Sequence, residues 1–368
     1  MHKKKILVLM KRFGSNKDMV KENFGREIRL LEPLAKKYTI DFLCPDYHLR
    51  EKFKIKKNGI NYFVVPVSFL NPFPMINSIN RLMSKNDYDV IIPTTEPLLG
   101  IVGYYFSRKY KISMVYEVQD NYEMYDSYKI PFVKYLEHKV IKKSDYIFYS
   151  NYPLMKKLRF LRKDKFEIIE NGVDLKLFRR VQKKTARTTL KIKQNIKLVT
   201  YTGHISEDRG INNLIEAVRQ LREKDKTIYL LLSGKADEGF NIKHSFIIYE
   251  ELPKREQLVM ALNASDVLII ASSDNPFTRY CFPQKLFEYM AVNVPIVATA
   301  VGDVIRILKP SRDSLCMPGS IDDLKAKIAV QLKKKNISHR KVAEHYTWEK
   351  LSKKVDKMVI HVTKFRLH

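Results

Sequence analysis

One carboxylate stands out because it lies inside an apolar helical pattern that ends just before an apolar strand. Within residues 283–298, Leu286, Phe287 and Met290 recur at helical spacing, and a proline suits the first turn. Glu288 therefore lies within the helix. A buried carboxylate is costly without a partner, and its two oxygens match two adjacent hydroxyls, such as those of a ribose. The alternative interpretation is a surface glutamate on an amphipathic helix.

A strand, a glycine turn and a helix start follow one another around residue 203. The apolar run 198–202 leads into Gly203 and His204, and a helical pattern begins at Ile211. This order presents backbone N–H groups and a positive helix end to an anion, and the nearby Arg209 adds a guanidinium suited to a diphosphate. A single turn of this kind most often only reverses the chain.

Two further polar turns follow predicted strands. Gly234 follows the strand at 228–232, and Asn171 follows the strand at 166–169. In a doubly wound sheet, such strand ends face one crevice. The three turns together favour a phosphate-handling site more than any one of them alone.

Apolar runs alternate with helical patterns along the whole chain, twice over. The predicted strands of the first half are 6–10, 40–43, 62–67, 90–92, 112–118, 146–149 and 166–169, with helices such as 25–37 and 131–142. Those of the second half are 198–202, 228–232, 246–249, 267–270, 296–300 and 315–317, with helices at 211–222, 255–263, 284–291 and 322–333. The alternation predicts an α/β fold of parallel sheets with helices on both faces.

The regular periodicity lapses in a basic segment between Phe178 and Ile196. We therefore predict two domains, 1–180 and 181–346, with a last helix at 347–368 that packs back on the first domain. At 368 residues and 45% hydrophobic content, the chain is long enough for two cores.

The cysteines and the apolar runs favour a cytoplasmic protein. Cys44, Cys281 and Cys316 are far apart and form no C-x-x-C pair, which argues against a disulfide framework and a structural zinc site. The first apolar run is interrupted at Lys11, so no signal peptide is expected. The apolar stretch 97–106 is about half the length of a membrane-spanning helix, so no transmembrane segment is expected either.

The formal net charge of +28 is spread over both halves of the chain. Two basic clusters, at 156–165 and 179–197, suit a nucleic acid, an anionic membrane surface or a polyanionic substrate, or form a solvated lysine-rich surface. Apolar residues interleave with the first cluster, which favours a membrane interface over a nucleic-acid groove; they are Leu154, Met155, Leu158, Phe160 and Leu161.

The chain resembles a retaining glycosyltransferase of family 4, among the group 1 glycosyl transferases, over essentially its whole length. The resemblance rests on E-N-G-V-D at 170–174, Y-T-G and R-G between 201 and 210, A-S-D-V-L-I at 264–269, K-L-F-E-Y-M-A and P-I-V-A between 285 and 298, and Y-T-W-E at 346–349. It implies the GT-B fold, in which two Rossmann-like doubly wound domains face a central cleft.

The resemblance also implies roles for residues of the second domain. Glu288 would hold the donor ribose, and Arg209 would grip the donor diphosphate, with His204 where an arginine is common. Lys285 would help to neutralise the leaving diphosphate. The remaining donor contacts would come from Gly203 and Gly234, from the backbone at Ile248 and Tyr249, and from the segment that contains Tyr280 and Phe282.

In the first domain, the resemblance implies that Asp120 positions the acceptor or stabilises charge on the sugar, and that Gly25 approaches the donor or acceptor. The chain departs from the family pattern at two positions. Tyr280 stands where many members have a second glutamate. Asn293 stands where a glycine is usual, although asparagine tolerates the left-handed conformation that such a turn needs.

The reaction implied is transfer of a hexose or N-acetylhexosamine from a UDP- or GDP-linked sugar to a hydroxyl acceptor, with retained anomeric configuration. We expect no metal, no further cofactor and no nucleic-acid partner. The expected acceptor is a glycan or a lipid-linked molecule, used in cell-surface polysaccharide or glycolipid synthesis. The expected location is the cytoplasm or the inner face of the cell membrane. A sugar-nucleotide epimerase, a non-catalytic nucleotide-sugar-binding protein and a nucleic-acid-binding protein are the alternatives.

Overall fold

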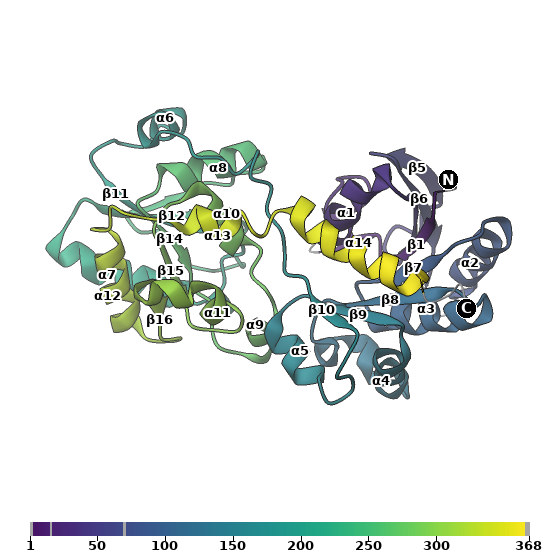
Figure 1. Ribbon diagram of the computed structural model, residues 1–368. Helices are drawn as coiled ribbons and strands as arrows, with labels where there is room; N and C mark the ends of the chain where they lie inside the picture. Colours follow the sequence, from purple (N-terminus) through teal and green to yellow (C-terminus); the bar gives the residue numbers. More distant parts are fainter. Residues whose placement is uncertain (1–2, 15–16, 69–70, 365–368) are drawn as a thin grey trace. The chain divides into compact units, whose positions relative to one another are not determined.

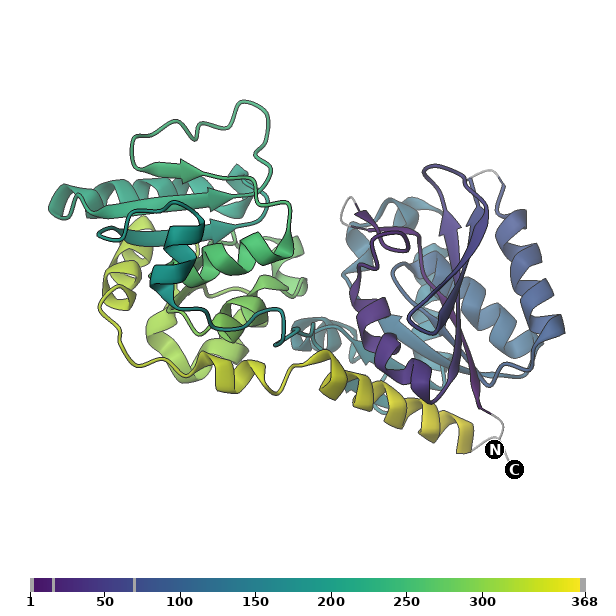
Figure 2. The same cartoon turned by 90° about the horizontal axis from the view of Figure 1, so that it is seen from above.

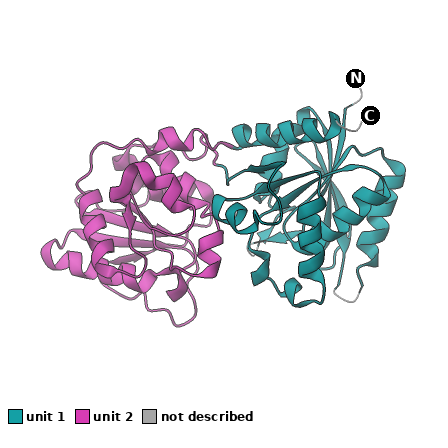
Figure 3. Cartoon of the chain, turned by 60° about the horizontal axis from the view of Figure 1, so that its bottom comes forward, with its two compact units in different colours: residues 1–172, 348–368 teal, residues 173–347 magenta. Residues whose placement is uncertain are grey.

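The computed structural model describes residues 3–14, 17–68 and 71–364. The chain divides into two compact units, which are coloured separately in Figure 3. Unit 1 comprises residues 1–172 and 348–368, and unit 2 comprises residues 173–347. The predicted boundary at residue 180 lies within unit 2, because Val173 N–H donates to the carbonyl of Tyr346 (2.9 Å) and Phe178 is fully buried in the core of that unit.

Unit 1 is built on an eight-stranded sheet with the order β10-β9-β8-β7-β1-β4-β6-β5. The strands are β1 (Lys5–Leu9), β4 (Thr39–Asp46), β5 (Phe53–Lys57), β6 (Ile60–Pro66), β7 (Val90–Pro93), β8 (Ser113–Val118), β9 (Tyr146–Tyr149) and β10 (Phe166–Ile168). All pair in parallel except β5, which runs antiparallel to β6 at the edge. The edge strand β5 was not predicted from the sequence; its alternating lysines suit an exposed edge. A small hairpin, β2 (Phe13–Gly14) and β3 (Lys17–Asp18), follows β1.

The helices of unit 1 are α1 (Arg26–Leu31), α2 (Phe73–Lys85), α3 (Pro97–Lys109), α4 (Val133–Lys143), α5 (Tyr152–Leu158) and α14 (Trp348–Lys364), with short 3₁₀ turns η1 (Glu32–Lys36), η2 (Tyr122–Met124) and η3 (Asp126–Lys129). The helix predicted at 25–37 is broken into α1 and η1, where Pro33 lacks a donor N–H. The last helix, α14, lies along α1 (Figures 1 and 2) and is tied to β8 by Ser113 Oγ, which donates to the carbonyl of Val362 (2.9 Å).

Unit 2 is built on a six-stranded parallel sheet with the order β13-β12-β11-β14-β15-β16. Its strands are β11 (Lys197–Thr202), β12 (Ile228–Ser233), β13 (Ile247–Tyr249), β14 (Val267–Ile270), β15 (Ile296–Thr299) and β16 (Leu315–Cys316). Its helices are α6 (Lys183–Thr189), α7 (Ile211–Lys224), α8 (Arg255–Ala264), α9 (Pro276–Tyr280), α10 (Lys285–Val292), α11 (Val304–Leu308), α12 (Ile321–Gln331) and α13 (His339–Ala343), with 3₁₀ turns η4 (Glu207–Arg209) and η5 (Lys309–Ser314).

The basic segment that was predicted to separate the domains contains a packed helix. Ala186 of α6 is fully buried, and the nearly buried Arg187 donates to the carbonyl of Ala264 (2.9 Å) and to Asp266 (2.7 Å). The lapse in apolar periodicity was misleading because α6 is short and attached through a guanidinium.

Each unit has its own apolar core, and the three cysteines are free. Within the described ranges, no helix combines the length and the apolar character that a bilayer-crossing segment requires.

Candidate functional site

Several of the predicted residues of unit 2 meet at the carboxyl ends of β11 and β12. The chain passes from β11 to β12 and β13 on one side of the sheet, whereas β14 to β16 lie on the other side. The strand order therefore reverses beside β11, and ligands of open α/β sheets bind in the crevice at such a reversal. The helix α10 reaches this place, since Lys285 Nζ donates to the carbonyl of Thr202 at the end of β11 (2.8 Å).

The two glycines at these strand ends permit an unusually close backbone approach. Gly203 has φ +127° and Gly234 has φ +133°, conformations that side chains rarely allow. A Cβ atom on Gly234 would lie 2.1 Å from the carbonyl oxygen of Gly203. The hydroxyl of Tyr249 donates to the carbonyl of Gly234 (3.0 Å), and Ile248 precedes it on β13, an edge strand with one unpaired row of backbone groups.

One face of α10 carries Lys285, Glu288 and Tyr289, at positions i, i+3 and i+4. The hydroxyl of the buried Tyr289 bonds to the amide (3.1 Å) and the hydroxyl (2.9 Å) of Thr202 and so fixes α10 against β11. Lys285 Nζ lies 4.0 Å from the ring centroid of Tyr201. Burial, and then the charge of Arg209, lower the pKa of Lys285 to about 7, while Glu288 opposes the change.

The carboxylate of Glu288 has a partner that sequence analysis did not identify. Arg255 Nη2, at the start of α8, donates to Glu288 Oε1 (2.9 Å). The side chain of Glu288 is 19% exposed. Burial raises its pKa, and the positive charges of Arg255 and Lys285 oppose this rise. Glu288 is therefore partly buried and is held by an arginine.

Arg209 and His204 lie on the loop between β11 and α7. The guanidinium of Arg209 is 5.4 Å from the ring centroid of Phe277, and its charge acts on Lys285. His204 Nε2 lies 2.7 Å from the carboxylate of Asp237. An anion near this loop meets the cations of Arg209 and Lys285 and the N-terminal end of α7.

The segment before α10 combines a core residue with a surface loop. Phe282 is 3% exposed and stacks on Phe287 with ring centroids 5.0 Å apart, so its side chain belongs to the core and its backbone is the part left to contact a ligand. Tyr280 ends α9. Gly302, which sequence analysis missed, has φ +57°, and a Cβ there would lie 2.9 Å from the carbonyl oxygen of Arg279. A glycine two residues after the predicted strand 296–300 was the available signal.

The predicted residues of unit 1 lie around a buried group of charges. Asp120, just beyond β8, accepts a hydrogen bond from the hydroxyl of Tyr125 (2.7 Å). Arg26 Nε donates to Glu117 (2.6 Å), and Arg26 Nη1 donates to Asn171 Oδ1 (3.1 Å). Asn171 thus takes part in this buried group of unit 1.

Gly25 faces Glu27, another buried acid of unit 1. Gly25 has φ +119°, and a Cβ there would lie 2.9 Å from Glu27 Oε2. Glu27 is 2% exposed, and among the described residues neither of its carboxylate oxygens has a hydrogen-bond partner. Burial, and then the charge of Glu117, raise the pKa of Glu27 to about 8. The carboxyl group is therefore mostly neutral at pH 7.

Residues 182–357 match the family model of the glycosyl transferases group 1. An uncharacterised glycosyltransferase of Methanocaldococcus jannaschii is 22% identical over 212 residues, which cover 52% of either chain. A putative teichuronic acid biosynthesis glycosyltransferase of Bacillus subtilis is 25% identical over 186 residues, 48% of this chain and 46% of the relative. The chain thus spans about half the length of these relatives, or less.

Solved structures share the fold over nearly the whole chain. Sucrose-phosphate synthase from Thermosynechococcus elongatus superposes with a TM-score of 0.75 at 17% identity and full coverage of both chains. The HepE protein of Anabaena, solved in complex with UDP, gives a TM-score of 0.71 at 16% identity and covers 97% of this chain and 100% of its own. The predicted α/β fold of the GT-B type, with two parallel-sheet domains, is confirmed.

Proposed function

We propose that the protein is a retaining glycosyltransferase that moves a hexose or N-acetylhexosamine from a UDP- or GDP-linked sugar to a hydroxyl acceptor. The observation that carries the proposal is the grouping of Arg209, Lys285 and Glu288 at the carboxyl ends of β11 and β12. The family match over residues 182–357 supports the same reaction class.

The two cations suit the leaving nucleoside diphosphate. Arg209 offers a planar fork of donors, and Lys285 offers a compact charge beside the Gly203 turn. Charge that develops on the leaving diphosphate in the transition state is stabilised by cations already in place. In this proposal no resident cofactor is needed, so a chelator leaves turnover unchanged.

Glu288 suits the donor ribose. Its Oε1 accepts from Arg255, and a ribose hydroxyl replaces or joins that bond when the nucleotide binds. The glycine turns at Gly203 and Gly234 let the diphosphate approach the backbone, and the edge strand β13 offers backbone groups at Ile248 and Tyr249 to the base.

The acceptor is assigned to unit 1, where Asp120 lies beyond β8. The relatives include the teichuronic acid enzyme and a capsular polysaccharide biosynthesis glycosyltransferase of Staphylococcus aureus, 24% identical over 37% of this chain. We therefore include in the proposal a glycan or lipid-linked acceptor of cell-surface polysaccharide or glycolipid synthesis at the cytoplasmic face of the membrane.

The test is a thermal-shift panel of UDP, GDP and their hexose and N-acetylhexosamine derivatives. A preferred donor raises the melting temperature by mass action, and Glu288→Gln removes most of that rise. The matched control is Glu256→Gln, an exposed carboxylate on α8 that leaves the rise unchanged.

Turnover of the preferred donor is then followed by NMR with membrane-derived acceptors. An anomeric configuration in the product equal to that of the donor supports the proposal. An isomerised free donor indicates an epimerase, and tight binding without turnover of any kind indicates a binding protein; either result contradicts the proposed transfer.

A further inference from the structure

Large apolar side chains gather on the outside of unit 1 around α4. Phe132, Tyr135 and Phe160 are 78%, 69% and 70% exposed, and Leu136 is 37% exposed. Phe160 lies against α4, with its ring centroid 6.0 Å from that of His138, one helical turn from Tyr135. We call the surface formed by these residues with the lysines of α4 the α4 face; it comprises Phe132, Tyr135, Leu136, His138, Lys139, Lys142, Lys143 and Phe160.

The backbone of Phe132 is unusual for an aromatic residue. Phe132 precedes the first turn of α4 with φ +68° and ψ −11°, a left-handed conformation that a bulky residue rarely adopts. The side chain is also the most exposed of the four, so core packing does not explain the conformation. An apolar residue that is strained and turned to solvent points to contact with another surface.

The same helix carries uncompensated positive charge. Lys139 and Lys142 follow Tyr135 at i+4 and i+7, and Lys143 follows Lys139 at i+4. All three are exposed, and within the described part of the chain none of them forms an ion pair. By contrast, Lys134 on the same helix is held by Glu123 (2.9 Å).

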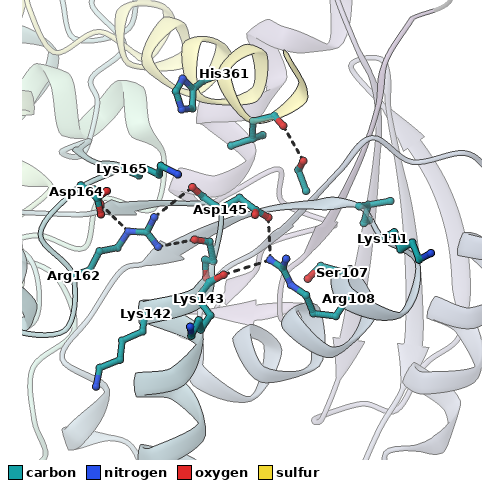
Figure 4. A pocket seen from close by; sticks show the side chains of 14 residues that line it. Ser107, Arg108, Lys111, Lys142, Lys143, Asp145, Arg162, Asp164, Lys165 and His361 are labelled. Atoms are coloured by element: carbon teal, nitrogen blue, oxygen red, sulfur yellow. Dashed lines mark hydrogen bonds and ion pairs between the residues drawn. The ribbon is translucent and has the colours of Figure 1, made fainter. Parts of the chain in front are cut away.

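A hollow of about 800 Å³ adjoins the end of α4, and the two arginines that line it are already engaged (Figure 4). The guanidinium of Arg162 donates to the carbonyls of Ser144 (2.6 Å) and Asp164 (2.7 Å), and Arg108 pairs with Asp145 (3.1 Å). In Figure 4 the side chains of Lys111 and Lys142 extend away from one another. These lysines lie near the C-terminal ends of helices and do not converge on one point. Such an arrangement suits a broad anionic surface better than a single bound phosphate.

We propose that the α4 face docks on an anionic lipid bilayer, with Phe132, Tyr135 and Phe160 entering the headgroup region and the lysines meeting lipid phosphates. Both halves of this interaction are typical of interfacial helices. The surface differs from the one expected from the sequence, because Leu154, Met155 and Leu161 are buried, and Phe160 is the one largely exposed apolar residue of the segment 154–165. Docking needs no sugar nucleotide, so it stands or falls independently of the proposed transferase reaction.

The experiment is co-sedimentation of the full chain with vesicles of phosphatidylcholine alone or with 30% phosphatidylglycerol. We expect binding to the anionic vesicles, which weakens as salt rises. The variant Lys142→Gln with Lys143→Gln binds about 25-fold more weakly, since each lysine near an anionic surface contributes about fivefold. Phe160→Ser binds about tenfold more weakly because it loses apolar burial.

Two matched controls separate this face from the overall positive charge. Lys184→Gln with Lys193→Gln removes two exposed lysines from the basic segment of unit 2, and Phe73→Ser removes a 66% exposed phenylalanine of α2; both leave vesicle binding unchanged. Equal losses in the controls overturn the proposal, as does the absence of binding to anionic vesicles. Binding to a short RNA that competes with vesicles and is insensitive to Phe160→Ser also overturns it, in favour of nucleic acid.

Discussion

The affinity for a nucleoside diphosphate sugar is predicted to fall as pH rises above 7, through the deprotonation of Lys285. Burial, and then the charge of Arg209, lower the pKa of this ammonium group from 10.5 to about 7 in the unliganded protein. A bound diphosphate places negative charge beside Nζ and raises the pKa again. Binding is therefore coupled to proton uptake by Lys285.

The magnitude follows from the fraction of Lys285 that is charged before binding. With a pKa of about 7, this fraction falls from about one half at pH 7.0 to about 3% at pH 8.5, so Kd rises about 15-fold across this interval. The donor sugar is the suitable ligand because its diphosphate is esterified at both ends and does not titrate in this range. At pH 7.0, about half a proton is taken up per donor bound.

Isothermal titration calorimetry in buffers of different ionisation enthalpy measures both quantities. Two variants serve as matched controls. Lys285→Arg stays charged and gives a pH-independent Kd, and Lys285→Gln gives a weaker Kd that is also pH-independent. A wild-type Kd that does not change between pH 7.0 and 8.5, with no proton uptake, would refute the assignment of Lys285 to the diphosphate.

Three further predictions concern stability. Gly234→Ala lowers the free energy of unfolding by about 3 kcal/mol or more, because its Cβ meets the Gly203 carbonyl. Gly239→Ala, at φ +78° with open space around it, lowers this free energy by about 1 kcal/mol. Urea denaturation measures both changes. The Glu27 carboxyl binds its proton more tightly in the folded than in the unfolded protein, so the free energy of unfolding falls as pH rises from 4.5 towards about 8. Glu27→Gln removes this loss, so the stability of the variant relative to wild type should increase by about 2 kcal/mol between pH 6 and 8. Absence of this gain would contradict a neutral Glu27 carboxyl. Asn293→Ala lowers the melting temperature more than Asn293→Gly, because Asn293 ends α10 at φ +57°; equal losses would show that its side-chain hydrogen bonds dominate instead.

Most of the fold was predictable because buried parallel strands are continuous apolar runs. The strands 146–149 and 267–270 were predicted with the bounds that the structure has, as β9 and β14. The strand β5 was missed since its residues alternate between lysine and apolar types over only five positions. The helix α6 was missed because a buried arginine, rather than an apolar stripe, attaches it.

The site was predictable only as far as local patterns reach. The helical position of Glu288, the two glycine turns of unit 2 and the left-handed Asn293 each follow from neighbouring residues. The Arg255–Glu288 pair joins two helices far apart in sequence, and no local pattern indicates it. The buried Arg26–Glu117 pair, which places Asn171 in unit 1, depends on the sheet topology in the same way.

The most direct test of the donor site is a crystal structure with the preferred nucleotide sugar bound. We predict that the ribose hydroxyls lie within about 2.6–3.2 Å of the Glu288 carboxylate, with the diphosphate beside Arg209 and Lys285. A nucleotide bound elsewhere, with Glu288 still paired to Arg255 alone, would contradict it.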